Sequence, residues 1–149
     1  MKSVPLGLLV ISFSFLFSQL NAQTVQWAHS ATSQGYEDGN AITADDSGNV
    51  YVSGQIEYTT HFDGGMQLSS NGIHDIFVGK YSPDGTLKWV RNAGGRGGDV
   101  GYGVAVDNLH NCYATGEIED TAQFSSTVSL VSAGGNDIFV SKYNMNGQL

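Results

Sequence analysis

The sequence is poor in cysteine, proline and basic residues. Among its 149 residues are one cysteine and two prolines, and 6 lysines and arginines stand against 14 aspartates and glutamates, for a formal net charge of -8. A single cysteine cannot form a disulfide within the chain, so none supports the fold. Phosphate binding needs a concentrated Lys/Arg surface, and the few cations here are scattered, which excludes a nucleic-acid partner.

The rest of the composition indicates a folded domain. Apolar residues make up 40% and aromatic residues 11%, which is too much for a disordered tail, and the 20 glycines show no collagen-like spacing. The chain is therefore an acidic, turn-rich, folded domain.

The one long apolar run lies near the N-terminus. Lys2 is followed by an uncharged apolar run at positions 6–17 and then by a polar segment rich in small side chains. A helix needs about 20 apolar residues to cross a bilayer. The pattern is typical of a secretory signal peptide over residues 1–22, cleaved after Ala22, with a buried N-terminal helix as the alternative. We expect an exported protein, secreted or at the cell surface, with no membrane span.

The remaining chain repeats itself at a constant offset. The segment Asp-Ile-Phe-Val-Gly-Lys-Tyr at 75–81 returns at 137–143 with a single change. The same offset aligns Trp27 with Trp89, no gap is needed between positions 25 and 149, and 23 of 63 aligned pairs are identical. Such a period is typical of a supersecondary unit that buries its apolar faces against copies of itself. The sequence predicts a repeat region over residues 23–149, with copy one at about 25–86 and copy two at about 87–149.

Short β-branched and aromatic segments between turn residues predict an all-β fold. The expected strands are residues 25–30, 41–45, 50–54, 76–81, 87–92, 103–107, 112–116 and 138–143, and residues 66–69 are a candidate edge strand. Asp-Ser-Gly-Asn at 46–49 and Ser-Pro-Asp-Gly at 82–85 suit hairpin turns. In residues 76–78 both faces of the strand are apolar, which favours a sheet covered on both sides.

Segments 48–54, 75–81, 84–89 and 101–107 together resemble the repeat of the bacterial seven-bladed β-propeller family (SBBP repeats). The resemblance implies that each copy forms one four-stranded antiparallel blade and that the protein is exported. It brings no shared catalytic residues. Copy two departs from the pattern at residues 109–112, which blurs its first turn.

Two units are too few to close a propeller of roughly four to eight blades. We expect about two blades, an incomplete propeller that leaves two apolar faces open to water. Either the chain is a truncated product or fragment whose missing blades cover these faces, or copies self-associate into a ring. In the second case the N-terminal outer strand of one chain completes a blade of another.

Few residues suggest chemistry, and no catalytic residues or cofactor are expected from the motifs. The candidates for a metal site are the repeated carboxylates Glu57, Glu119, Asp75 and Asp137, which could form a ring that binds Ca²⁺. The alternative for the two aspartates is a hydrogen bond from turn amides. The repeated tryptophans and tyrosines are candidates for a sugar-stacking platform, with packing between blades as the alternative.

These observations lead to a functional hypothesis. We expect an exported, non-catalytic β-propeller repeat protein that serves as a binding or scaffolding module at the cell surface or outside, for a protein or glycan ligand. The alternative is part of a larger secreted carbohydrate-active enzyme whose catalytic residues lie in missing blades.

Overall fold

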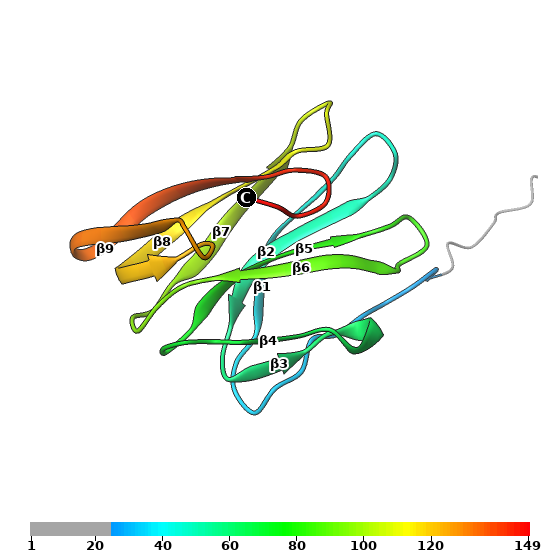
Figure 1. The fold of residues 1–149 in the computed structure, drawn as a ribbon. Coiled ribbons are helices and arrows are strands. Elements are labelled where there is room, and N and C mark those ends of the chain that lie inside the picture. Colours follow the sequence, from blue (N-terminus) through cyan, green and yellow to red (C-terminus); the bar gives the residue numbers. More distant parts are fainter. Residues whose placement is uncertain (1–24) are drawn as a thin grey trace, which may run out of the picture.

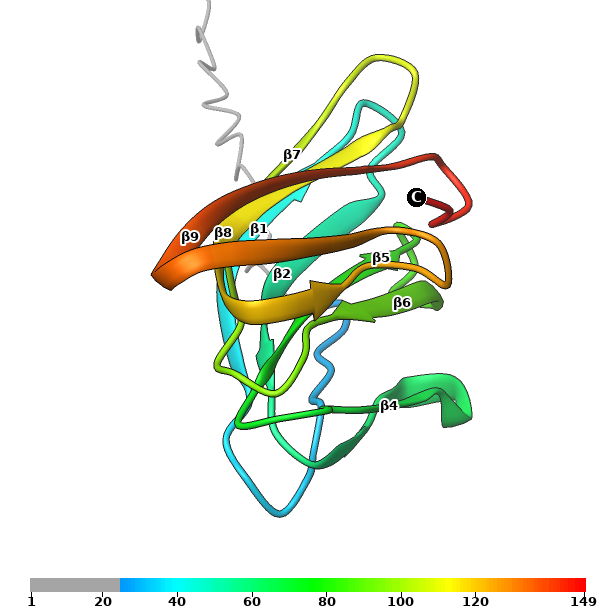
Figure 2. The same cartoon turned by 60° about the vertical axis from the view of Figure 1, so that its left-hand side comes forward.

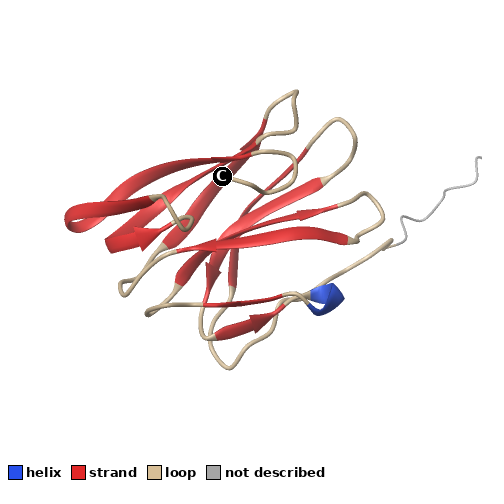
Figure 3. Ribbon diagram, in the orientation of Figure 1, coloured by secondary structure: helices blue, strands red, loops and turns tan. Residues whose placement is uncertain are grey.

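The computed structural model describes residues 25–149, and the expected signal peptide, residues 1–22, lies outside the described residues. The described part is built from nine strands and one short 3-10 turn, Asp63–Gly65. Figure 1 and Figure 3 show that strands and their connecting loops make up nearly all of it. The all-β prediction is confirmed.

Four strands form an antiparallel sheet, called sheet one. They are β1 (Asp38–Ala44), β2 (Val50–Ile56), β5 (Asp75–Tyr81) and β6 (Leu87–Ala93), in the order β1-β2-β5-β6. The expected strands 41–45, 50–54, 76–81 and 87–92 lie within these elements, give or take a residue at their ends. Sheet one thus has four antiparallel strands, but copy one supplies only three of them, and the fourth, β6, comes from the start of copy two.

Three strands form a second antiparallel sheet, called sheet two. They are β7 (Val100–Val106), β8 (Cys112–Gln123) and β9 (Ser129–Tyr143), in the order β7-β8-β9. The residue that aligns with Leu87, at the start of β6, is Leu149. Within the described residues, the outer edge of β9 therefore has no strand beside it.

A short hairpin differs between the two copies. In copy one, β3 (Thr59–His61) and β4 (Gln67–Ser69) pair with each other in a separate two-stranded sheet. In copy two the aligned residues extend β8 and β9, past an irregularity in register between Glu119 and Thr121. The candidate edge strand at 66–69 therefore forms, but it pairs with β3 and does not join sheet one.

One expected strand is wrong. Residues 25–30 form no strand, although the aligned residues 87–92 lie in β6. The physical reason is the partner edge: β6 hydrogen-bonds to β5, and no strand among residues 25–149 pairs with residues 25–30 in the same way. Instead, the Trp27 indole Nε1 donates a hydrogen bond of 3.1 Å to the Pro83 carbonyl and ties the segment to sheet one.

The two sheets stack face to face and bury the main core between them (Figure 2). Its members from sheet one are Tyr51, Ile76, Val78, Trp89 and Ala93, and those from sheet two and its hairpin include Cys112, Ala114, Ile118, Phe124, Phe139 and Tyr143. A second cluster, Ile56, Phe62, Phe77, Leu87 and Val90, covers the opposite face of sheet one. This open stack of antiparallel sheets is consistent with an incomplete β-propeller.

A carboxylate braces the first turn of each copy. Asp45 accepts hydrogen bonds from the backbone N–H of Ser47 and Asn49, the Asn49 amide at 2.8 Å and the Tyr51 hydroxyl at 3.1 Å. Asp107, its aligned counterpart in copy two, repeats the pattern with Leu109, Asn111 and Tyr113. Burial raises the pKa of Asp45, but its hydrogen bonds, chiefly those from Asn49, outweigh this and lower it to about 2.

We expect Asp45→Ala to reduce the free energy of unfolding at pH 7 by about 1–3 kcal/mol, because the substitution leaves partly buried donors without an acceptor. Urea denaturation followed by tryptophan fluorescence measures the change. The matched control is Asp46→Ala, since the neighbouring side chain is largely exposed.

The same carboxylate gives the expected pH dependence. Because folding lowers the pKa of Asp45 from 3.8 to about 2, its contribution is complete above pH 3.8 and is lost as pH falls toward 2. The stability difference between wild type and Asp45→Ala should therefore shrink over this window. A difference that stays constant down to pH 2 would contradict the role of the ionised carboxylate.

Candidate functional site

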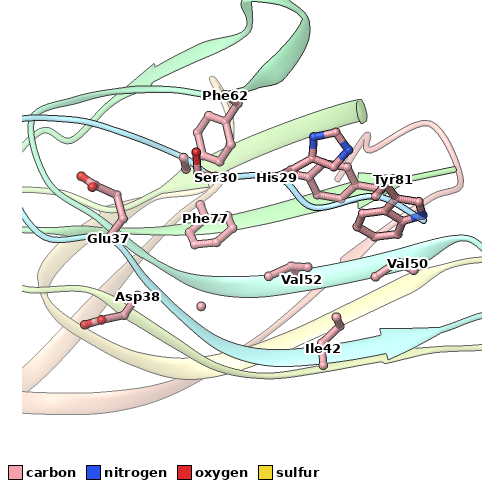
Figure 4. Close-up of a pocket in the computed structure, with 13 residues that line it drawn as sticks. His29, Ser30, Glu37, Asp38, Ile42, Val50, Val52, Phe62, Phe77 and Tyr81 are labelled. Atoms are coloured by element: carbon pink, nitrogen blue, oxygen red, sulfur yellow. The ribbon is translucent and has the colours of Figure 1, made fainter. Parts of the chain in front are cut away.

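A groove of about 380 Å³ lies on the face of sheet one that points away from sheet two (Figure 4). The N-terminal segment, residues 27–31, lines one side, and Ile42 of β1 lines the other. Val52 and Phe77 lie between them. The groove exists because strand side chains alternate between faces: Val52 and Phe77 point here, while their neighbours pack against sheet two.

The aromatic side chains of the groove stack on one another. The rings of Trp27 and Tyr81 lie 6.1 Å apart and those of His29 and Tyr81 5.6 Å apart, each pair at 16°. The His29 imidazole also pairs with the Asp63 carboxylate. The lining is largely apolar: the aromatic rings of Trp27, Phe62, Phe77 and Tyr81 lie beside the aliphatic side chains of Ile42, Val50 and Val52, and Ile42 is 70% exposed. Such a lining suits the apolar side chains of a protein surface, and its aromatic rings are also of the kind that stack on sugar faces.

Two carboxylates stand at one end of the groove and are held by neighbouring side chains (Figure 4). Glu37 accepts hydrogen bonds from the hydroxyls of Ser33 and Thr60. Asp38 accepts a hydrogen bond of 3.0 Å from the Gln55 amide. They add negative charge at the rim of a chain that is already acidic.

The repeated glutamates do not line the groove; they fix connecting loops. The Glu57 carboxylate accepts the backbone N–H of Tyr36 at 3.3 Å, and Glu119 accepts that of Gly98 at 2.9 Å. Both contacts span the same sequence separation in the two copies. Each glutamate therefore holds the loop that leads into the first strand of its own unit.

The repeated aspartates also accept backbone amides. Asp75 is fully buried and accepts the Asn71 backbone N–H at 3.2 Å and the Asn71 side-chain amide at 3.0 Å. Asp137 accepts the aligned backbone N–H, that of Ala133, at 2.6 Å. These are the hydrogen bonds from turn amides that the second interpretation predicts. Burial, with the nearby Asp99 carboxylate, raises the pKa of Asp75.

The structure brings together three groups that the sequence did not single out. Ligand atoms of Asp45, Asp46 and His110 lie within 4.8 Å of one another. His110 Nδ1 is 3.0 Å from Asp45 Oδ2 and so links the first turns of the two copies. Because Asp45 already accepts four hydrogen bonds within its own turn, the cluster works as a link between units.

One signal in the sequence pointed to this contact. His110 aligns with Gly48, and both have a positive φ, 61° and 78°. A histidine in the left-handed region carries a backbone cost that glycine avoids. Its presence there indicates a compensating contact, which the hydrogen bond to Asp45 supplies.

We expect His110→Ala to be less stable than His110→Gly by about 1 kcal/mol, because both lose the hydrogen bond to Asp45 and alanine alone keeps the left-handed backbone cost. Paired urea denaturation curves measure the difference. Equal stabilities of the two variants would show that the backbone at this turn relaxes.

The burial of the aromatic and sulfur side chains limits what else they can do. Tyr51, Trp89 and Tyr143 are buried in the core between the sheets, as the packing interpretation expects, whereas Trp27 and Tyr81 line the groove. Cys112 is buried with them, and burial raises the pKa of its thiol to about 12. A thiol that stays protonated is a poor nucleophile.

In comparisons with known proteins, no family model and no curated protein matches this chain. Over residues 25–149, no helix has the length and apolar character needed to cross a membrane. The groove and the two repeated units are therefore the features on which a functional assignment depends.

Proposed function

We propose that this protein is an exported β-propeller repeat protein of the SBBP type that acts as a non-catalytic binding and scaffolding module at the cell surface or outside the cell. The observation that carries the proposal is the open apolar groove on sheet one, with Ile42 exposed at its side. An exposed apolar groove on a folded domain is characteristic of a surface that a partner covers.

The arrangement of polar groups supports binding over catalysis. Glu57, Glu119, Asp75 and Asp137 each accept backbone amides and so serve the fold. In the described residues, the one group of three side chains placed to share a metal ion lies in the turns and includes the fully engaged Asp45. The groove has no convergent set of free polar groups that would position a small substrate.

The repeat supports the propeller assignment. Two units of equal length, in which segment 75–81 corresponds to segment 137–143, stack antiparallel sheets on each other, and sheet one carries an apolar cluster on each face. Blades of a propeller pack in this way.

The groove is tested by placing a charge in it. We expect Ile42→Glu to abolish binding of the fluorescently labelled protein to the envelope fraction of the cells that secrete it. Leu109→Glu is the matched control, since Leu109 is 76% exposed in the β7–β8 turn, away from the groove. Equal binding of the two variants would contradict the groove as the binding surface, and cleavage of labelled envelope glycans by the wild type would contradict the non-catalytic assignment.

The export part of the proposal has its own test. We expect the protein outside the cell to begin at Gln23, because the apolar run and the small residue Ala22 fit cleavage after that position. Mass spectrometry of the N-terminal peptide from culture medium and envelope fractions measures this. A chain that keeps Met1 and stays in the cytoplasm would contradict it.

A further inference from the structure

The two ends of the stack present different open surfaces. On β9, Ile138 is 87% exposed and Val140 is 72% exposed; we call these two side chains the tail face. Their counterparts in copy one, Ile76 and Val78, are each 1% exposed because sheet two covers them. The same two apolar positions are thus buried in one unit and open in the other.

The groove is the complementary surface. Its residues Val52, Phe77 and Tyr81 align with Ala114, Phe139 and Tyr143 in copy two. Those three counterparts are buried in the core between the sheets, together with Ile76 and Val78. The chain therefore already contains one joint between a tail-type and a groove-type surface, and it leaves one surface of each type open.

A free strand edge lies beside the tail face. β5 is paired on both sides, with β2 and β6, whereas β9 is paired only with β8 in the described part of the chain. The segment that aligns with β6 but lacks a partner is residues 25–31.

Residues 25–31 lie against sheet one in the position that β6 occupies relative to sheet two. The Trp27 indole donates a hydrogen bond of 3.1 Å to the Pro83 carbonyl. The Trp89 indole of β6 donates one of the same length to the Met145 carbonyl. Donor and acceptor occupy equivalent positions of the repeat in the two cases. Residues 25–31 therefore stand against sheet one as β6 stands against sheet two.

We infer that the groove binds the tail face of a second copy of this chain, and that residues 25–31 of the first copy add an antiparallel strand to the free edge of β9 of the second. The inference rests on the groove being a binding surface, as proposed above, and names its occupant. The internal joint supplies the register: β5 and β6 pair Ile76 with Ala93 and Val78 with Arg91.

In the repeat alignment, Ile138 corresponds to Ile76 and Ala31 corresponds to Ala93. The same register between copies therefore places Ile138 of the second copy opposite Ala31 of the first. Val140 is placed opposite His29 in the same way. Strand addition of this kind supplies backbone hydrogen bonds, and the groove supplies specificity through the two apolar side chains.

The joint between copies is weaker than the joint within the chain. The polar contacts that cross the internal joint include His110 with Asp45 at 3.0 Å and the Asn40 amide with the Gly101 carbonyl at 3.1 Å. In the joint between copies, Gly48 of the first copy takes the place of His110, and Tyr102 of the second copy takes the place of Asn40. Glycine has no imidazole and tyrosine has no side-chain amide, so both contacts are lost. The full sequence also carries a formal charge of -8, and cleavage after Ala22 would remove one further positive charge, that of Lys2. Association should therefore depend on concentration and become stronger with salt, which screens the repulsion.

The experiment uses the exported chain and two charge variants. Ile42→Glu blocks the groove and Val140→Glu blocks the tail face, and both side chains are exposed in the single chain, so neither substitution disturbs its core. Light scattering after gel filtration measures the mass. We expect the wild type to grow beyond a dimer with concentration, each variant alone to stay at one chain, and their equimolar mixture to form a dimer and nothing larger, because only one joint is intact.

Further variants test the specificity of the joint. Leu109→Glu should associate as the wild type does. A mixture of His29→Cys and Val140→Cys chains should be linked by a short bismaleimide, while a mixture of His29→Cys and Val131→Cys should not, since Val131 lies on β9 outside the proposed contact.

Several outcomes would overturn the inference: a wild type that stays monomeric up to millimolar concentration and high salt, a mixture of the blocked variants that forms no dimer, or Leu109→Glu behaving as the blocked variants do. A monomeric wild type that still binds the envelope fraction through Ile42 would overturn the inference alone and leave the proposed function standing. In that case the groove binds a different protein.

Discussion

A strand with apolar side chains on both faces needs a neighbouring layer on each side, and the rest of this structure depends on that requirement. In β5, Ile76 and Val78 point toward sheet two while Phe77 points into the second cluster. One sheet cannot satisfy both faces by itself, because alternate side chains point in opposite directions. Each unit therefore needs a neighbouring unit to bury its apolar side chains, and this need explains why the unit is repeated in the sequence.

Local polar contacts keep the two units alike so that they can stack in the same way. The carboxylates of Asp45 and Asp107 fix the first turn of each copy, and Glu57 and Glu119 fix the entering loop. None of these contacts requires the other unit. The shape of each surface is thus set within its own copy before the copies meet, which allows one joint geometry to be used repeatedly.

The sequence predicted what depends on neighbours in the chain and missed what depends on neighbours in space. Strands such as 50–54 and 76–81 were found because alternation and flanking turns are local signals. Residues 25–30 have the same pattern as β6, but a strand also needs a partner edge, and none is present in the described chain.

In the candidate site too, the sequence indicated local features and missed contacts between residues that are distant in the sequence. The repeated carboxylates were visible in the sequence, yet their role became clear only from the amides they accept. The sequence analysis expected open apolar faces and noted Trp27 and Tyr81 as repeated aromatic positions, but it did not identify the groove, because its lining comes from segments that are distant in the sequence. The link from His110 to Asp45 was visible only as an unexplained departure from glycine in the alignment.

The difference between the internal joint and the open surfaces sets an order of assembly. The polar contacts of the internal joint include those of His110 and Asn40, and its halves are tethered, which gives them a high effective concentration. The open groove and tail face have the apolar positions without these contacts. Pairing within the chain therefore precedes contact with any partner, so the chain presents a folded surface and not a partly exposed core. Because the main core is buried within the chain, the open groove can serve as a binding surface without promoting aggregation during folding.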